Sequence, residues 1–549
     1  MPALAQSLQG QDLGHLQIIA EHWGLELHAP DVLTALEILI PHMLERQRFD
    51  EVFETFPENA HQALQALMHN GGRLPWQGFI RRFGVVREMG PGRRDRQRPD
   101  RQPASPAEVL WYHALMARAF FDTPSGPEEY AYIPDELMAL LPVPQGDQMT
   151  PLGRPATPAE RSNPIPTSDR ILDDACTLLA ALRLGLPDEA LSFDFASPYP
   201  LSPFPLKALL FSAGLLDPGG LPLPEPTRAF LEASRGEALA QLVSAWQDST
   251  DFNELAFTPG LILEGDWLND PRRARRAILD FLASLPLASL PGDTWWNLEA
   301  FVTAIHQYHP DYQRPAGDYD TWIIRRRDSP DYLRGFEHWD QVDGALIRFL
   351  IGGPLYWLGI ADLATLPDSL TVSAFRFSPW SEALLDGLAP VGPPLEDGLV
   401  QVRSDGRLRL PRLTPRAVRY QISRFCEWEG EVDQVYRYRL TPVSLERARQ
   451  QGLQLSHLLA LLGRHAKTVP PVLVKALKRW EERGVEARLE PVLVLRLSSP
   501  EVLQALRASR AARFLGDPLG PSAVIVKPGA REKVLAAILE LGYLVEELL

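Results

Sequence analysis

The stretch from residue 436 to residue 484 decides the fold expected for the C-terminal third. It reads YRYRLTPVSLERARQQGLQLSHLLALLGRHAKTVPPVLVKALKRWEERG. Thr441 precedes Pro442, which predicts a helix start, because threonine caps free N–H groups and proline loses no hydrogen bond in the first turn. This first helix is expected over 443–451, and Gly452 ends it. Three short helices are predicted in all, as the following residues indicate.

Ser456 predicts the cap of the second helix, which ends at Gly463, and Pro470-Pro471 open the third. In the third helix Leu473, Leu477 and Trp480 recur at i, i+4 and i+7, which places them on one apolar stripe. The basic residues off this stripe are Lys475, Lys478, Arg479 and Arg483. A basic last helix after a tight turn is typical of a helix-turn-helix, whose last helix enters the major groove of DNA. A three-helix protein-docking module with a solvated basic face is an equally weighted alternative.

The flanking segments predict small β elements. A hairpin is expected over 400–410, with its turn at Asp405-Gly406, and a long basic helix then runs from Arg416 to Trp428. After Gly484 the pattern alternates between short apolar strands and helices. The expected order is a strand at 491–497, a helix at 500–509, a strand at 523–527, a helix at 530–541 and a strand at 544–549.

Residues 399–549 resemble the helicase-associated domain that precedes the motor in XPB/Ssl2-type helicases. The resemblance rests on the run YRLTPVSL from Tyr438 to Leu445 and on the helix end from Trp480 to Gly484. The same module is known in chains without a motor, including the TFIIH subunit that anchors XPB. The resemblance therefore implies association with DNA machinery and does not imply ATPase activity.

Charge is distributed unevenly along the 549 residues. The net charge is −15, and residues 399–549 hold 25 Lys and Arg against 16 Asp and Glu, or +9, so residues 1–398 carry −15 − 9 = −24. A phosphate-binding role is therefore expected in the C-terminal module or in local arginine clusters. The two cysteines, Cys176 and Cys426, have no His or Cys at ligand spacing, which predicts a reducing, cytoplasmic setting.

The N-terminus lacks the basic-then-apolar pattern of a signal peptide, and the longest apolar run, 346–366, is interrupted by Arg348 and Asp362. We therefore expect neither a signal peptide nor a membrane span.

The whole chain is predicted to be mainly α with small β-hairpins, built from tandem winged-helix-like units plus a C-terminal α/β helicase-associated module. Helices followed by a hairpin that turns at Ser125-Gly126 indicate the first winged helix. Residues 169–250 and 340–387 share an order of apolar helix, glycine-apolar pair, Pro-rich link and capped helix, which indicates a degenerate repeat of this unit. The expected parts are a helical segment at 1–57, a winged-helix-like domain at 58–142, a Pro-rich linker at 143–168, winged-helix-like regions at 169–290 and 291–398, and the helicase-associated domain at 399–549.

Candidate DNA contacts come from the basic face of the third helix, from the long basic helix and from an arginine-rich loop within the first winged helix. In such a loop, arginines are more often solvated surface residues than phosphate contacts. The candidates are Lys467, Lys475, Lys478, Arg479, Arg483, Arg416, Arg419, Arg424, Arg93 and Arg94.

Several chemistries lack their motifs. None of the six lysines follows a glycine, so the chain contains no G-x-x-x-x-G-K-[ST] loop to hold the phosphates of a helicase motor. His306 and His309 beside Asp311 form the only spacing that hints at a metal, and without a third ligand we interpret them as core or helix-end histidines. We expect no enzyme activity, no metal and no cofactor, while a nuclease assembled from dispersed carboxylates stays formally open.

These observations predict a non-catalytic, helicase-associated DNA-binding protein of DNA repair or transcription, with duplex DNA as its partner. A scaffold that pairs with a separate XPB-type helicase is the main alternative. A transcription regulator or defence component built on the same winged helices is a weaker one.

Overall fold

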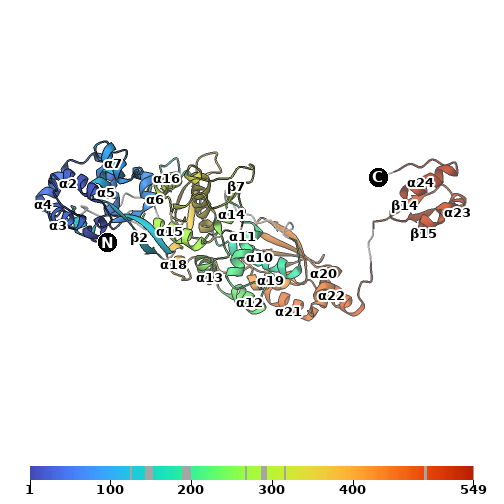
Figure 1. The fold of residues 1–549 in the computed structure, drawn as a ribbon. Helices are drawn as coiled ribbons and strands as arrows, with labels where there is room; N and C mark the ends of the chain where they lie inside the picture. Colours follow the sequence, from blue (N-terminus) through green and yellow to red (C-terminus); the bar gives the residue numbers. More distant parts are fainter. Residues whose placement is uncertain are drawn as a thin grey trace. The chain divides into compact units, whose positions relative to one another are not determined.

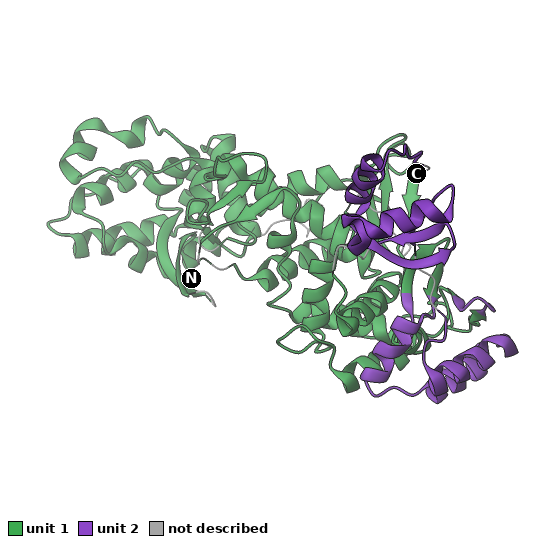
Figure 2. Ribbon diagram, turned by 90° about the vertical axis from the view of Figure 1, so that its right-hand side faces the viewer, with its two compact units in different colours: residues 1–401, 409–424, 428–438 green, residues 402–408, 425–427, 439–549 purple. Residues whose placement is uncertain are grey.

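The computed structural model describes residues 1–123, 126–142, 152–187, 199–265, 267, 269–285, 294–314, 317–487 and 491–547. Helices predominate and small antiparallel sheets accompany them (Figure 1). The expectation of a mainly α protein with small β elements is confirmed. The chain divides into two compact units (Figure 2). Unit 1 comprises 1–401, 409–424 and 428–438, and unit 2 comprises 402–408, 425–427 and 439–549.

Residues 4–141 of unit 1 share one hydrophobic core, and we call this part the N-terminal lobe. Some of its helices begin at side-chain caps such as Ser105, whose hydroxyl accepts a hydrogen bond from the Glu108 N–H at 3.1 Å. Its elements are α1 Leu4–Leu8, α2 Leu13–His22, α3 Val32–Met43, α4 Arg46–Glu54, α5 Glu58–His69, β1 Arg73–Pro75, α6 Trp76–Phe83, α7 Pro91–Gln97, α8 Pro106–Tyr112, β2 Ala117–Thr123, β3 Gly126–Tyr132 and α9 Asp135–Met138. Of the predicted turn at Ser125-Gly126, the first residue lies outside the described residues.

A second core joins residues 152–384, which we call the central lobe. Of the predicted linker at 143–168, residues 143–151 lie outside the described part, and Asn163–Ile165 forms strand β4, which pairs with β8. The elements are β4, α10 Ile171–Leu184, α11 Pro203–Ser212, α12 Pro224–Glu232, α13 Arg235–Asp248, α14 Glu254–Phe257, β5 Leu261–Leu263, α15 Pro271–Ala283, β6 Trp296–Asn297, α16 Leu298–Tyr308, β7 Ile324–Arg326, α17 Ala345–Leu350, β8 Ala361–Thr365, β9 Val372–Phe377 and α18 Ser381–Leu385.

Two parts of unit 1 have a similar order of elements. In the N-terminal lobe, α5 is followed by β1, α6, α7, α8 and the hairpin β2–β3, and the sheet order is β1-β3-β2. In the central lobe, α15 is followed by β6, α16, β7, α17 and the hairpin β8–β9, and the sheet order is β6-β9-β8, with β4 beyond β8. The two orders differ in that α7 of the first is replaced by β7 in the second. The repeat thus relates 58–132 to 271–377, whereas the sequence suggested a repeat of 169–250 and 340–387.

The C-terminal third contains a sheet of order β10-β11-β13-β12, a group of three helices and a separate small α/β part. Its elements are β10 Gln401–Val402, β11 Arg407–Pro411, α19 Arg416–Ser423, β12 Glu427–Val432, β13 Val435–Arg439, α20 Pro442–Gln450, α21 Leu455–His465, α22 Pro471–Arg483, β14 Leu493–Arg496, α23 Pro500–Ala508, β15 Leu515–Gly520, β16 Ala523–Val526 and α24 Arg531–Glu540. The predicted hairpin at 400–410 is found as β10 and β11.

Several local predictions were wrong. The helix expected from Arg416 to Trp428 ends at Ser423, because Trp428 lies in β12 and packs on Tyr436 and Tyr438 of β13. Ser456 does not cap α21, which begins one residue earlier after Gln454. That helix continues through Gly463 to His465.

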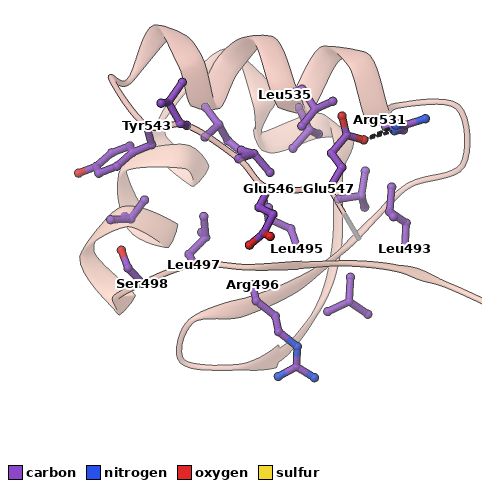
Figure 3. A pocket seen from close by; sticks show the side chains of 17 residues that line it. Leu493, Leu495, Arg496, Leu497, Ser498, Arg531, Leu535, Tyr543, Glu546 and Glu547 are labelled. Atoms are coloured by element: carbon purple, nitrogen blue, oxygen red, sulfur yellow. Dashed lines mark hydrogen bonds and ion pairs between the residues drawn. The ribbon is translucent and has the colours of Figure 1, made fainter. Parts of the chain in front are cut away.

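The small α/β part has its own core, drawn from residues 495–538. Strand β15 was not predicted, and no strand forms over 544–547, the described portion of the expected last strand. Instead, Figure 3 shows Tyr543 and Glu547 lining a cavity of about 490 Å³ between β14 and α24, with Glu547 paired to Arg531.

Candidate nucleic-acid interface

The three helices α20 to α22 are positioned by local signals. The Thr441 hydroxyl accepts a hydrogen bond from the Ser444 N–H at 3.1 Å, and the Ser444 hydroxyl accepts one from the Thr441 N–H at 3.0 Å. Thr441 also donates to a Glu427 carboxylate oxygen at 2.8 Å, and Ser444 donates to the Phe425 carbonyl at 2.8 Å. Reciprocal capping of this kind satisfies two N–H groups that the helix leaves free. The start of α20 is therefore fixed to the loop and strand that precede it.

Helix α22 has the two faces that the sequence predicted. Leu473 and Leu477 are buried, whereas Lys475 and Lys478 are exposed. Within the described residues neither lysine forms a hydrogen bond or an ion pair. Trp480 is half-buried, so the apolar stripe is less enclosed at its C-terminal end. The two lysines lie away from the apolar stripe and are available to bind an anion.

The other cations of this surface are exposed too, and some are partly neutralised. Arg479 donates to Glu486 at 3.0 Å, and Arg483 lies 3.6 Å from the same carboxylate. Lys467 is exposed on the link between α21 and α22. Surface ion pairs of this kind are weak and exchange readily with other partners. We call Lys467, Lys475, Lys478, Arg479 and Arg483 the α22 basic face.

Two predicted contacts, Arg416 and Arg419, lie in the interior and are withdrawn from the candidate interface. The Arg416 guanidinium donates to Glu396 at 2.6 Å and to the Ala233 carbonyl at 2.7 Å. The Arg419 guanidinium lies over the Tyr436 ring at 3.9 Å and donates to backbone and side-chain oxygens of α10. A guanidinium enclosed in this way cannot reach a DNA phosphate.

These arginines belong to a buried ion cluster that the sequence did not reveal. Arg235 donates to Asp173 at 2.8 Å, and Arg412 pairs with both Asp169 and Asp173. Burial alone would raise the pKa of Asp169, but Arg235 and Arg412 bring it below its ordinary value. The cluster ties segment 396–419 to α10 and α13. Residues 409–424, which the sequence assigned to the helicase-associated domain, are thereby anchored in unit 1.

The remaining predicted arginines differ in exposure. Arg94 is buried, and its guanidinium is bonded to Asp12 at 2.7 Å, so it is also withdrawn. Arg93 is exposed and donates to Gln97. Arg424 is half-buried at the end of α19, where burial and then the charge of Arg183 lower its pKa. The arginine-rich segment as a whole is helix α7 and its flanks, which are used mainly in intramolecular pairs.

The two histidines with metal-like spacing are stacked on aromatic rings. His306 lies on Phe336 with centroids 5.1 Å apart, and His309 lies on Phe281 at 4.9 Å. Burial, and then the charge of Arg82, lower the pKa of His309. Over the part of the chain that the structure describes, no group of three His, Cys, Asp or Glu side chains is placed to hold a metal ion.

Sequence reasoning missed Arg464, which is exposed at the end of α21 beside the α22 basic face. The signal was present, since a cation in the last turn of a helix is favoured by the helix dipole and stays solvated. None of the helices in the described ranges is long and apolar enough to cross a membrane.

Comparison with known proteins places similarity on this C-terminal region. The family described as helicase conserved C-terminal domain matches residues 400–517, from the β10–β11 hairpin into the small α/β part. The chain is therefore similar to a helicase-associated family over this stretch.

Two curated proteins are similar to part of this chain. The DNA 3'-5' helicase XPB of Kineococcus radiotolerans is 33% identical over 162 residues, which cover 28% of this chain and 29% of that helicase. The DNA 3'-5' helicase XPB of Mycobacterium tuberculosis is 28% identical over 162 residues, which cover 28% of this chain and 30% of the relative. The chain thus spans under a third of the length of these helicases. The expected position of the domain before a motor stays a prediction.

Proposed function

We propose that this protein is a non-catalytic, helicase-associated DNA-binding protein that contacts duplex DNA through the α22 basic face. The observation that carries the proposal is the pair Lys475 and Lys478, exposed and without a partner among the described residues. The pair lies within the stretch that is similar to helicases. Phosphate contacts by such lysines supply most of the sequence-independent affinity of proteins for DNA.

The repeated order of elements in unit 1 supports winged-helix units. In both parts a helix, a short strand, further helices and a hairpin follow one another, and the second hairpin strand pairs with the short strand, which is an arrangement expected of winged helices. The last helix before each hairpin is largely buried: α8 buries Leu110 and Tyr112, and α17 buries Leu346 and Phe349. We infer that these units are architectural and that DNA contact is left to α22.

Absence of catalysis is part of the proposal and rests on the sequence. The six lysines lack the glycine neighbour that a phosphate-cradling loop needs. Both curated relatives are named as helicases, but the similarity to them covers less than a third of their length. ATP-driven unwinding is therefore not proposed for this chain.

The second candidate function is a scaffold that pairs with a separate XPB-type helicase. It is favoured by the net charge of −24 in residues 1–398, which repels DNA from most of the molecule. It is also favoured by the burial of Arg94, Arg416 and Arg419, which were predicted to contact DNA. Under this alternative the α22 basic face binds an acidic surface of the helicase. With either candidate we propose a role in DNA repair or transcription. We also propose a cytoplasmic location, because the two cysteines have no partner at ligand spacing in the sequence.

The experiment that tests the proposal uses the full chain, because residues 409–424 are anchored in unit 1 and a fragment starting at 399 leaves Arg412 without Asp169 and Asp173. Binding to a labelled 20-base-pair duplex is measured by fluorescence anisotropy. The double variant Lys475→Glu/Lys478→Glu is expected to weaken binding at least tenfold, since it replaces attraction with repulsion at two contacts.

The matched control is Arg507→Glu/Lys533→Glu, which makes the same charge change on the exposed surface of the small α/β part. It is expected to alter binding less than threefold. Equal losses in both variants would show that net charge, not this surface, governs binding. Co-purification of an XPB-type helicase after nuclease treatment, lost in the Lys475→Glu/Lys478→Glu variant, would instead support the scaffold.

A further inference from the structure

A cavity of about 490 Å³ lies inside unit 1, between α6 of the N-terminal lobe and α15 and α16 of the central lobe. Its volume is in the range of small-molecule binding sites. Eight of the 18 lining residues carry aromatic rings, which are supplied by Phe79, Phe83, Phe281, Tyr308, Tyr312 and Phe336, together with the imidazoles of His306 and His309. Two adjacent arginines of α6, Arg81 and Arg82, also line it.

The first of these arginines is fully engaged by the protein. Arg81 donates to Asp311 at 2.9 Å and to the Gly317 carbonyl at 3.4 Å. Its guanidinium lies over the Tyr319 ring at 4.8 Å and over the Phe336 ring at 4.6 Å. Arg81 therefore holds the two walls of the cavity together, and it neutralises Asp311, the one carboxylate in the lining.

The second arginine has no such partners. Among the described residues, the Arg82 guanidinium makes no hydrogen bond or ion pair, and it rests on Tyr308 at 5.1 Å and on Phe83 at 4.9 Å. Partial burial lowers the pKa of Arg82, because no carboxylate compensates for the lost hydration. By its accessible surface Arg82 is exposed while it lines the cavity. A cation that is accessible and has no counter-charge of its own among the described residues can bind an anion that enters the cavity.

The other lining residues indicate which chemical group would accompany the anion in such a ligand. His309 is flat against Phe281, at an interplanar angle of 27°, and burial and the charge of Arg82 lower its pKa, so the ring is neutral near pH 7. The face beyond Arg82 is thus aromatic and carries no free negative charge. Flat aromatic groups gain stacking energy on walls of this kind.

We propose that this cavity binds a nucleotide, with the phosphate on Arg82 and the base against the aromatic wall. A phosphate joined to a flat aromatic base is common to a free nucleoside monophosphate and to an unpaired nucleotide of a DNA strand. The site lies in unit 1 and uses none of the residues of the α22 basic face. The proposal of a nucleotide site can therefore be tested independently of duplex DNA binding.

The test is isothermal titration of the full chain with AMP, with dTMP, with a ten-residue oligothymidylate and with inorganic phosphate. Saturable binding of the mononucleotides at least tenfold tighter than that of phosphate is expected, because phosphate alone gains no stacking. Equal affinity for phosphate and mononucleotide overturns the aromatic part of the proposal. Tighter binding of the oligonucleotide than of dTMP assigns the site to a strand, and the reverse order assigns it to free nucleotides.

Two variants locate the site. Arg82→Gln is expected to weaken nucleotide binding about tenfold, equivalent to about 1.4 kcal/mol, and Ala277→Phe is expected to abolish it by filling the cavity from α15 without changing charge. Arg96→Gln is the control, because Arg96 is exposed on α7 of the same lobe and donates only to the Gly92 carbonyl of its own helix. Circular dichroism and melting temperature confirm that each variant folds. Binding that survives both Arg82→Gln and Ala277→Phe, or an absence of binding by every probe, overturns the proposal.

Discussion

Single residues of the buried ion cluster decide how the C-terminal segment is attached. Arg235 is almost fully enclosed and is shared by Asp169, Asp173 and Glu396. A buried charge whose partner is removed cannot be hydrated and destabilises the folded state strongly. The cluster makes the packing of segment 396–419 specific, since apolar contacts alone would tolerate other arrangements.

Replacing Arg235 by glutamine is expected to lower the free energy of unfolding of unit 1 by about 3 to 5 kcal/mol, because two buried carboxylates lose one of the two cations that they share and keep only Arg412. Urea denaturation followed by tryptophan fluorescence measures the loss. The matched control is Arg228→Gln, since Arg228 is exposed and pairs only with Glu232 at 3.1 Å. A loss below about 1 kcal/mol for Arg235→Gln, similar to that of an exposed pair, would contradict the role given to the cluster.

Asp174 makes stability depend on pH. Burial raises the pKa of this carboxyl from 3.8 to about 7, and one of its oxygens has no hydrogen-bond partner. The folded protein therefore keeps a proton that the unfolded chain releases. The stability that this proton gives is fully present below pH 3.8 and is lost as pH rises through 7.

Asp174→Asn removes this dependence, because the amide stays neutral. Between pH 5 and pH 8 the variant is expected to gain about 2 to 3 kcal/mol of stability relative to the unmodified protein. Urea denaturation at the two pH values, for both proteins, measures the difference. The same pH dependence in both proteins would show that Asp174 is not the responsible group.

At the scale of elements, the sequence predicted what local signals control. Thr441, Gly452 and Pro470 placed the starts and ends of α20 and α22 to within one residue, because caps and breakers act on the nearest turn. The end of α19 and the strand β12 were missed, since the pairing of β12 with β13 depends on the packing of Trp428 on two tyrosines. Helix periodicity in the sequence does not predict such side-chain packing.

The same contrast between local signals and long-range packing applies to the candidate site. The exposed lysines of α22 could be predicted, because the positions of Leu473 and Leu477 fix which face is buried. The burial of Arg416 and Arg419 could not be predicted, because it depends on distant segments: the Ala233 carbonyl is 183 residues from Arg416, and the Asp173 carbonyl is 246 residues from Arg419. The sequence of an amphipathic helix does not distinguish a basic residue that faces solvent from one that faces a distant carboxylate.

Thr441→Ala is expected to destabilise the three-helix group by about 1 to 2 kcal/mol, since it removes the cap of α20 and the bond to Glu427. Hydrogen exchange of the α20 amides should rise correspondingly. Thr468→Ala, an exposed position on the link before α22, serves as the control and should change little. Unchanged exchange in α20 after Thr441→Ala would contradict the assigned cap.

At the scale of the whole molecule, the boundary predicted at residue 399 does not coincide with the division into units. Residues 409–424 and 428–438 are part of unit 1, whereas the small α/β part has a core of its own. The other predicted domain boundaries stay predictions, although one core spans 4–141 and another spans 152–384. Long-range packing of this kind leaves no periodic signal in the sequence.

Truncations test this organisation. A chain that ends at residue 486 lacks only the small α/β part and is expected to keep its melting temperature within about 3 °C. A chain that ends at residue 398 loses Arg412 and Arg416 and is expected to melt at least about 10 °C lower or to aggregate. Differential scanning calorimetry distinguishes the two. Equal melting of both truncations would show that segment 409–438 does not stabilise unit 1.

The most direct test of the central claim is the salt dependence of duplex DNA binding by the full chain. The logarithm of the association constant is plotted against the logarithm of the salt concentration for the unmodified protein and for Lys475→Gln/Lys478→Gln. If the α22 basic face contacts phosphates, the variant's slope is shallower by about 1.8, or about 0.9 for each lost contact. Parallel lines for the two proteins would contradict the account.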